Sequence, residues 1–163
     1  MNRKIFAISV VVLAIDQISK SVIGTMLQLN ESFTVINNFF NITLVHNYGA
    51  AWSIFNNRVS LLVIGTTIAL AVIYRYMYSF KMNKRNTIVF GILTGGILGN
   101  LVDRVFLGYV IDFFDFNILG YSFPVFNIAD IAIVIGVALL VYAIIKGEDK
   151  NEKNNSPRKI GKN

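Results

Sequence analysis

The stretch at residues 87–104, TIVFGILTGGILGNLVDR, decides the fold. It contains no charged residue until its last two positions, Asp103 and Arg104. An uncharged apolar run of this kind predicts a helix that crosses a membrane, with the polar residues at its outer end. The membrane therefore sets the architecture to which the rest of the chain must conform.

The same stretch repeats glycine at a spacing of four, at Gly91, Gly95 and Gly99. This spacing puts three small residues on one helical face, where a second helix can approach closely. Such stripes are common in membrane bundles, so the pattern indicates packing rather than chemistry.

Three further apolar runs occur at about residues 5–25, 59–78 and 127–145. The first is long enough to cross a hydrocarbon core of roughly 30 Å as a helix. Over the whole chain 55% of the residues are hydrophobic and 15% are charged, which is more apolar than a typical water-soluble domain. We therefore expect an all-α integral membrane protein with four transmembrane helices at about residues 5–25, 59–78, 87–103 and 127–145.

Basic residues border these runs on one side of the expected membrane. They are Arg3, Lys4, Lys81, Lys84, Arg85 and Lys146, followed by a cationic tail at 147–163. The two outer loops, at about 26–58 and 104–126, contain few cations and many aromatic residues. By the positive-inside rule both termini should be cytoplasmic.

The first outer loop predicts local structure of its own. Phe40, Ile42 and Leu44 alternate with polar residues after an Asn-Asn turn, which favours a small extracytoplasmic β-hairpin or cradle. Residues 50–55 include Trp52 and Phe55 and should form a short interfacial helix. Residues 1–146 then make one domain, and 147–163 a disordered tail, because the tail is too polar to bury a core.

Composition excludes several classes of function. The chain has no cysteine, which removes disulfides and thiolate chemistry, and one histidine, His46, which makes a histidine-based metal site improbable. The cations lie at the borders of apolar runs rather than along one face, which argues against nucleic-acid binding. We expect no metal and no cofactor.

Two groups of polar residues interrupt the apolar runs. Asp16 and Lys20 stand four residues apart and can pair on one helical face. Asn100 shares a face with Asp103, which has Arg104 as its cationic neighbour in sequence. Pairing that pins one helix to another is the simplest role for these charges.

Asp112 and Asp130 have no cation within a helical turn in sequence. Asp112 lies among apolar residues, which should raise its pKa, whereas Asp130 lies three residues after Asn127, which can cap the fourth helix. Two carboxyls in contrasting environments can act as acid and base in hydrolysis. From the residues alone Asp103 could equally pair with Asp130, and Asp115 is a further acid that we expect in an exposed loop.

Five motifs occur in the order of one known family along almost the whole chain. They are Asp16-Gln17-Ile18-Ser19-Lys20, Asn47-Tyr48-Gly49-Ala50-Ala51-Trp52, Gly99-Asn100-Leu101-Val102-Asp103-Arg104, Val110-Ile111-Asp112-Phe113 and Phe126-Asn127-Ile128-Ala129-Asp130. On these motifs the chain resembles lipoprotein signal peptidase, also called signal peptidase II or prolipoprotein signal peptidase, of aspartyl peptidase family A8.

The resemblance implies an aspartyl endopeptidase that removes the signal peptide from diacylglyceryl-modified prolipoproteins, cutting before the lipidated cysteine. It assigns the catalytic dyad to Asp112 and Asp130, in a multi-pass protein of the bacterial plasma membrane with the active site near the extracytoplasmic surface. The supporting positions that it implies are Asn47, Gly49, Asn100, Asp103, Arg104, Asn127, Ala129, Asp16 and Lys20. It also implies a monomer in contact with membrane lipid, and inhibitors such as globomycin that block the dyad.

Two other classes of protein compete with this interpretation. A small transporter would use the acids and Lys20 as an ion path, but the four runs show no convincing internal repeat. A scaffold protein would use the glycine stripe as an interface, but it leaves Asp112 and Asp130 without a use.

Overall fold

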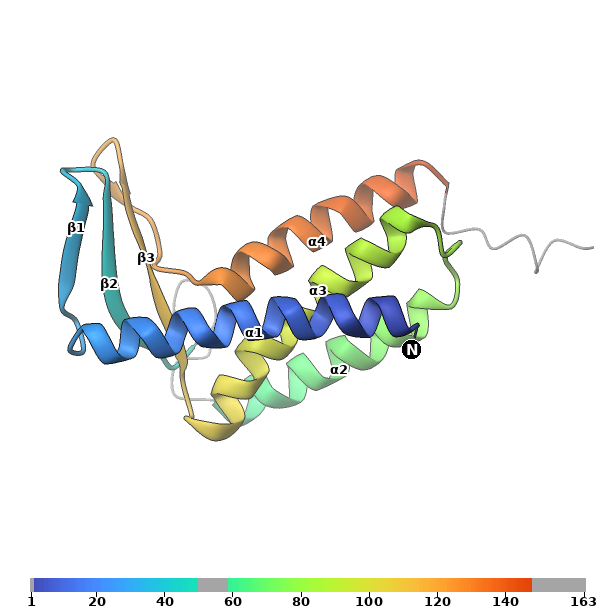
Figure 1. Cartoon of the computed structure of the whole chain (residues 1–163), viewed down its shortest axis with the longest axis horizontal. Helices are drawn as coiled ribbons and strands as arrows, with labels where there is room; N and C mark the ends of the chain where they lie inside the picture. The colour runs from blue at the N-terminus through green and yellow to red at the C-terminus, as the bar shows by residue number, and fades with distance from the viewer. Residues whose placement is uncertain (1, 50–58, 148–163) are drawn as a thin grey trace, which may run out of the picture.

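Four helices and a four-stranded sheet make up the computed structural model, which describes residues 2–49 and 59–147 (Figure 1). The elements are, in order, α1 (Arg3–Met26), β1 (Ser32–Ile36), β2 (Phe40–Asn47), α2 (Val59–Met77), α3 (Lys84–Phe106), β3 (Val110–Ile118), β4 (Tyr121–Ser122) and α4 (Ile128–Ile145). All four helices are long and apolar enough to cross a membrane. The number and approximate positions of the expected helices are therefore confirmed.

The helix α3 begins earlier than its apolar run. The side chain of Asn83 accepts a hydrogen bond from the backbone N–H of Asn86, at 2.8 Å, and so caps the helix ahead of Lys84. At the other end α3 continues past Asp103 to Phe106. The apolar run marks the part of the helix suited to lipid, whereas capping decides where the helix itself begins.

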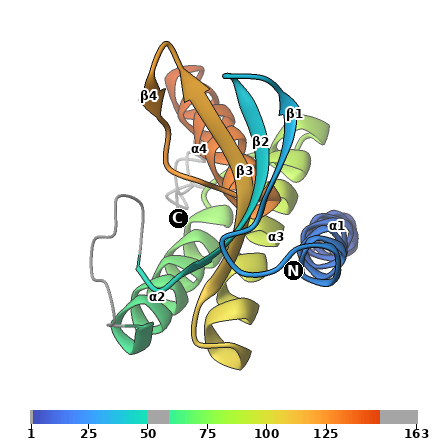
Figure 2. The ribbon, with the colours of Figure 1, turned by 90° about the vertical axis from the view of Figure 1, so that its left-hand side faces the viewer.

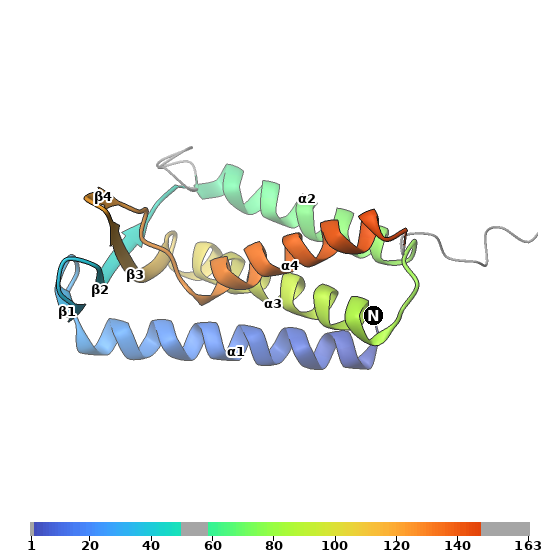
Figure 3. The ribbon, with the colours of Figure 1, turned by 90° about the horizontal axis from the view of Figure 1, so that it is seen from above.

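The helix α3 is the centre of the bundle and contacts α1, α2 and α4 (Figure 3). A Cβ added at Gly91 would lie 2.6 Å from the Ile8 side chain, and one at Gly95 would lie 2.7 Å from the Ser9 carbonyl oxygen. The predicted glycine stripe is thus the surface of α3 on which α1 packs. On another side of α3, a Cβ at Gly96 would lie 2.7 Å from the Ala129 carbonyl oxygen, so α4 approaches just as closely.

The sheet combines both outer loops in the order β1-β2-β3-β4, with every neighbouring pair antiparallel (Figure 2). The expected hairpin is present as β1 and β2, and Asn38 in its turn has φ of 58°. Pairing of β2 with β3 sets Asn47 opposite Val110, and Val45 opposite Asp112.

We expected an all-α fold with a loop at 104–126. The loop is wrong, because β3 and β4 lie within that segment, and the fold is therefore not purely helical. The sequence VIDFFDFNI of β3 has apolar residues on both faces and so lacks the alternation that marks a half-buried strand. Its partner β2 is also remote in sequence, and only the folded bundle brings the two together. The expected interfacial helix at 50–55 and almost all of the expected tail lie outside the described residues.

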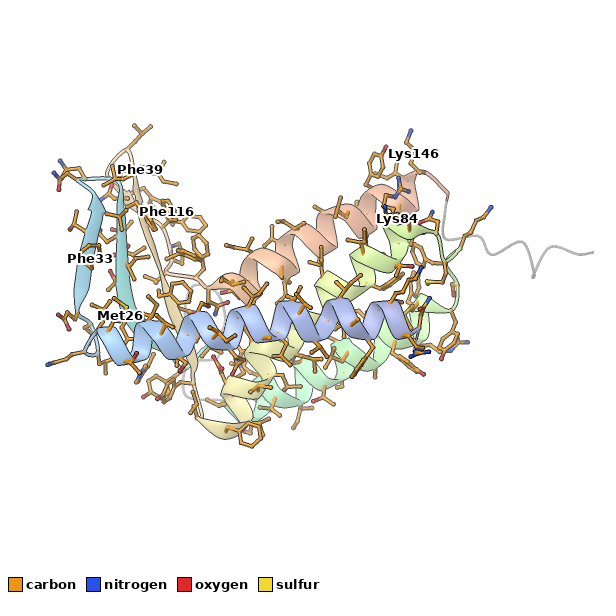
Figure 4. All side chains as sticks on the ribbon, viewed as in Figure 1. Met26, Phe33, Phe39, Lys84, Phe116 and Lys146 are labelled. Atoms are coloured by element: carbon orange, nitrogen blue, oxygen red, sulfur yellow. The ribbon has the colours of Figure 1, made fainter. Side chains whose placement is uncertain are left out.

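The sheet lies at one end of the bundle, and the N-terminus, the α2–α3 connection and the end of α4 lie at the other (Figure 1). Lys84 and Lys146 project from that second end, whereas Phe33, Phe39 and Phe116 project from the sheet (Figure 4). The molecule therefore has a cationic end and an aromatic end, separated by the length of the helices.

We predict that Gly95→Val destabilises the fold by about 1–3 kcal/mol, because the new side chain would overlap the backbone of α1. Gly65→Val is the matched control, since a Cβ at Gly65 on α2 meets nothing within 4 Å. Thermal unfolding in detergent measures both. Equal midpoints for the two variants would show that close approach of α1 to α3 is not needed.

Candidate active site

Asp112 is a buried carboxyl on β3, with 2% of its surface exposed. Its Oδ2 accepts a hydrogen bond from Asn47 Nδ2 at 2.8 Å, and its Oδ1 accepts one from Asn127 Nδ2 at 2.6 Å. Asn47 comes from the neighbouring strand β2, and Asn127 from the start of α4. Each oxygen therefore faces an amide donor from a different element.

Asp130 occupies the first turn of α4, where the helix dipole favours a carboxylate. Asn127 caps this helix, since its Oδ1 accepts the backbone N–H of Asp130 at 2.9 Å. In return Asp130 Oδ2 accepts the backbone N–H of Asn127 at 3.2 Å, which completes a capping box. The predicted cap is present. The remaining oxygen of Asp130, Oδ1, accepts Asn100 Nδ2 at 2.7 Å.

Backbone pairing brings the two carboxyls to one place. The N–H groups of Phe113 and Phe114 both donate to the carbonyl oxygen of Phe126, at 3.0 and 2.8 Å. These bonds tie the residue just before the α4 cap to the part of β3 that follows Asp112. Asn127 can then contact Asp112 with its side chain while it caps the helix that carries Asp130.

The pKa of Asp112 is raised from its ordinary value of 3.8 to about 7, mainly by burial and next by the negative charge of nearby Asp130. Hydrogen bonds from Asn47 and Asn127 and the charge of Lys20 act against these two causes. Near neutral pH the Asp112 carboxyl is therefore poised between its protonated and ionised forms. Coupled carboxyls of this kind can hold one proton between them.

A buried ammonium group lies behind the dyad. Lys20 on α1 is 2% exposed, and its Nζ lies 2.9 Å from Asp16 Oδ2 and 2.9 Å from Asp103 Oδ2. It also donates to Asn100 Oδ1 at 3.0 Å. Asp103 thus pairs with Lys20 on another helix instead of with its sequence neighbour Arg104.

The two acids of this network also bind backbone groups beside the dyad. Asp16 Oδ1 accepts the N–H of Ala129 at 2.8 Å, and Asp103 Oδ2 accepts the N–H of Ile111 at 3.1 Å. Ala129 directly precedes Asp130, and Ile111 directly precedes Asp112. Two buried carboxylates therefore hold the backbone on which each member of the dyad sits.

Arg104 connects the network to the end of the hairpin, since its Nη2 donates to the carbonyl oxygen of Gly49 at 3.2 Å. Asn47 Oδ1 accepts the N–H of Gly49 at 2.9 Å. The chain therefore turns sharply after β2, and the turn fixes the amide of Asn47 with its nitrogen toward Asp112.

Two polar residues gain partners that the sequence did not indicate. Gln17 Nε2 donates to Asp103 Oδ1 at 2.8 Å and to Asp16 Oδ2 at 3.2 Å, so Gln17 belongs to the network although we assigned it no role. A polar residue beside Asp16 in an apolar helix was the available signal. Asp115 does not lie in an exposed loop, because it is half-buried on β3 and accepts a hydrogen bond from Thr43 Oγ1 at 2.8 Å.

All the positions named from the sequence as site residues thus join one connected cluster, built from α1, β2, the turn after it, α3, β3 and α4. At its centre are two carboxyls, one of which titrates near neutral pH. Such a pair can take a proton from water and donate one to a carbonyl oxygen, which is the acid/base chemistry of hydrolysis.

Comparison with protein families gives a match over residues 8–146 to the model described as signal peptidase (SPase) II. Lipoprotein signal peptidase of Staphylococcus aureus (strain bovine RF122 / ET3-1) is 41% identical over 160 residues, which covers 94% of this chain and 98% of that protein. The corresponding protein of strain JH9 is 40% identical over the same shares.

Two solved structures are also similar, both described as bacterial membrane enzyme structures obtained by the in meso method. The one at 2.3 Å resolution has a TM-score of 0.80 and 37% identity, covering 99% of this chain and 96% of that chain. The one at 1.9 Å has a TM-score of 0.74 and 36% identity, covering 90% and 95%. The similarity thus extends over the helices and the sheet together.

We predict that the Asp112 carboxyl makes thermal stability depend on pH. The folded chain keeps the proton up to about pH 7, whereas the unfolded chain releases it near 3.8, so stability should fall as the pH rises through this window and level off above it. Asp112→Asn removes this contribution. The melting temperature of the variant minus that of the wild type should rise by several degrees between pH 4 and 7.5, and a constant difference would contradict the raised pKa.

Proposed function

The chain belongs to the signal peptidase II family, and on that premise we propose that Asp112 and Asp130 are its catalytic dyad. Members of this family are aspartic peptidases, and this protein is a multi-pass bacterial membrane enzyme that removes the signal peptide from prolipoproteins. We further propose that the substrates are diacylglyceryl-modified and are cut just before the lipidated cysteine.

The observation that carries this proposal is the position of Asn127 between the two carboxyls. Its side-chain Nδ2 donates to Asp112 Oδ1 at 2.6 Å, and its backbone N–H donates to Asp130 Oδ2 at 3.2 Å. Both carboxyls are therefore hydrogen-bonded to one buried residue. Asp103, the competing acid, forms an ion pair with Lys20 at 2.9 Å, whereas the hydrogen bonds to the Asp112 and Asp130 carboxyls come from neutral N–H groups; this favours a supporting role for Asp103.

In the proposed reaction the ionised carboxylate takes a proton from water, and the water oxygen bonds to the scissile carbonyl carbon. The protonated carboxyl donates to the carbonyl oxygen as negative charge develops there. The C–N bond then breaks as the proton taken from water passes to the leaving amine of the cysteine. The proton given to the carbonyl oxygen returns to the carboxyl that donated it, and the signal peptide leaves as a carboxylic acid. We assign the acid role to Asp112, because its raised pKa lets it hold a proton near neutral pH, and the base role to Asp130.

The surrounding residues have distinct proposed roles. Asn47, Asn100 and Asn127 present N–H donors to the dyad oxygens, which holds the carboxyls in place. The bonds from Asn47 and Asn127 also limit the rise of the Asp112 pKa. Arg104 and Gly49 position the turn that follows β2. Asp16, Lys20, Asp103 and the N–H of Ala129 fasten α1, α3 and α4 behind the dyad.

We propose an orientation with both termini in the cytoplasm and the dyad near the extracytoplasmic surface. Support comes from the charge distribution: Lys84 and Lys146 lie at the end of the bundle opposite the sheet (Figure 4). Water can reach a dyad at the outer surface while the acyl chains of the substrate remain in lipid. We propose further that residues 1–146 work as a single monomeric domain, and that inhibitors such as globomycin bind at the dyad.

We predict that Asp112→Asn and Asp130→Asn each lower the rate of cleavage by about 10²–10⁴-fold or more, because each removes one partner of the acid/base pair. The assay follows a synthetic diacylglyceryl prolipoprotein with purified protein in detergent. Asp115→Asn is the matched control, an acid on the same strand that lies outside the cluster, and should keep its activity. Cleavage by folded dyad variants would refute the choice of residues, and an inactive wild type would refute the substrate.

We predict that kcat falls as the pH rises above about 7, because Asp112 then loses the proton that it must donate. The sign follows from the raised pKa: the protonated form is present below about 7 and is lost above it. Initial rates at saturating substrate between pH 5 and 9 measure this, with stability checked at each pH. A rate that stays constant to pH 9 would contradict the acid role of Asp112.

A further inference from the structure

Lys20 uses every hydrogen of its ammonium group. A protonated lysine has three donors and no acceptor, and three oxygens lie within reach of Lys20 Nζ: Asp16 Oδ2 and Asp103 Oδ2 at 2.9 Å each, and Asn100 Oδ1 at 3.0 Å. The side chain is 2% exposed. The ammonium is thus held in one geometry, with two of its three bonds to carboxylates and the third to an amide that contacts the dyad.

We infer that Lys20 is a positioning residue of the proposed peptidase site, which holds the Asn100 carboxamide with its nitrogen toward Asp130. This inference rests on the proposed function. It assigns Lys20 a role in turnover, beyond that of joining α1 to α3. The chain of contacts is short: Lys20 Nζ to Asn100 Oδ1 at 3.0 Å, then Asn100 Nδ2 to Asp130 Oδ1 at 2.7 Å.

The orientation of Asn100 has two states that differ sharply in energy because of Lys20. As observed, the amide oxygen faces the ammonium and the amide nitrogen faces the carboxyl of Asp130. After a flip, NH₂ would face the ammonium and C=O would face Asp130, so that donor meets donor and acceptor meets acceptor in a buried place. Asn127 Nδ2 also donates to Asn100 Oδ1, at 3.0 Å. Without Lys20, this would be the one donor left among the observed contacts of that oxygen.

The other two amides around the dyad are oriented without Lys20. Asn127 is fixed as the N-cap of α4, and Asn47 is fixed by the N–H of Gly49, each at 2.9 Å. Both of these constraints come from the backbone. Asn100 lies inside α3, where its own backbone is already used in the helix, so its orientation depends on a side chain from another helix.

A purely structural role for Lys20, in which it only joins α1 to α3, does not account for its contacts. Gln17 Nε2 already donates to both carboxylates, to Asp103 Oδ1 at 2.8 Å and to Asp16 Oδ2 at 3.2 Å. Gln17 and Lys20 therefore share the same two acids on α1 and α3. Of these two side chains, it is Lys20 that donates to Asn100, and this bond is directed toward Asp130.

The charges around Lys20 fix the expected direction of a pH effect. Asp16 of α1 and Asp103 of α3 face the Lys20 ammonium directly. Asp130 of α4 and Asp112 of β3 lie beyond Asn100. Arg104 is a second cation that acts on the dyad. Burial is the main cause that raises the pKa of Asp112, followed by the charge of Asp130, and Lys20 acts against both. Removal of Lys20 should therefore shift the titration of the dyad to higher pH.

The test compares Asp103→Asn with the double variant Lys20→Met/Asp103→Asn. Replacing Lys20 alone would leave two buried carboxylates without a cation, and the fold could fail for that reason. In the double variant one carboxylate is gone, so the net charge of Asp16, Lys20 and Asp103 equals that of the wild type. The comparison of the two variants then isolates Lys20, because the loss of Asp103 is common to both.

Relative to Asp103→Asn, the double variant should lose kcat by about tenfold or more with KM within about twofold, and its pH–rate profile should move up by about one pH unit. Gln17→Leu is the control for bracing, and should lower the melting temperature without moving the pH profile. An unchanged kcat and pH profile in the folded double variant would overturn the inference. So would a shift of the same size in Gln17→Leu.

A second variant applies if the double variant does not fold. Lys20→Arg keeps the cation and its pairing with the acids, but a planar guanidinium cannot direct three divergent donors at these three oxygens. We expect a folded enzyme with kcat lowered about tenfold or more, and wild-type kcat would overturn the inference. Failure of the proposed function is separate, since in that case the wild type does not cleave the lipidated substrate, or folded Asp112→Asn still does.

Discussion

The ion pairs of Lys20 with Asp16 and Asp103 join α1 to α3 inside the bundle, directly behind Asp112 and Asp130. Three charges buried among apolar helices would each be costly alone, and removing one partner of such a group leaves an uncompensated charge. The requirement therefore forces α1 close to α3, and the glycine stripe of α3 provides the space. A Cβ at Gly99 would lie 2.6 Å from Asp16 Oδ2, so the packing surface and the ion network are the same place.

This network also explains how two aspartates on different elements reach a common site. Asp16 binds the backbone next to Asp130, and Asp103 binds the backbone next to Asp112. The charges behind the dyad thus fix the main chain, while three asparagines engage the carboxyl oxygens. With the backbone and the side chains both held, the proton transfer that we propose would need little reorganisation, which is what electrostatic preorganisation requires.

The sheet bounds the site at one end of the helical bundle. It joins two segments that are far apart in sequence, and the β2–β3 pairing sets Asn47 beside the strand that carries Asp112. The aromatic residues of this end contact one another, as in the stacking of Phe40 on Phe116 with ring centroids 4.5 Å apart. A hydrogen-bonded sheet at the end of the helical bundle places Asp112 beside the first turn of α4, where spanning helices alone would offer only their termini.

The sequence by itself determined the four helices, the hairpin, the cap at Asn127 and the pairing of Asp16 with Lys20. Each of these depends on residues that are close in the chain, so composition, alternation or spacing carries the signal. Only the tertiary structure decided that 110–118 is a strand, that Asp103 pairs with Lys20 instead of Arg104, and that Gln17 joins the network. In these cases the partner lies tens of residues away in the chain. Contacts between such distant segments form only when the helices pack.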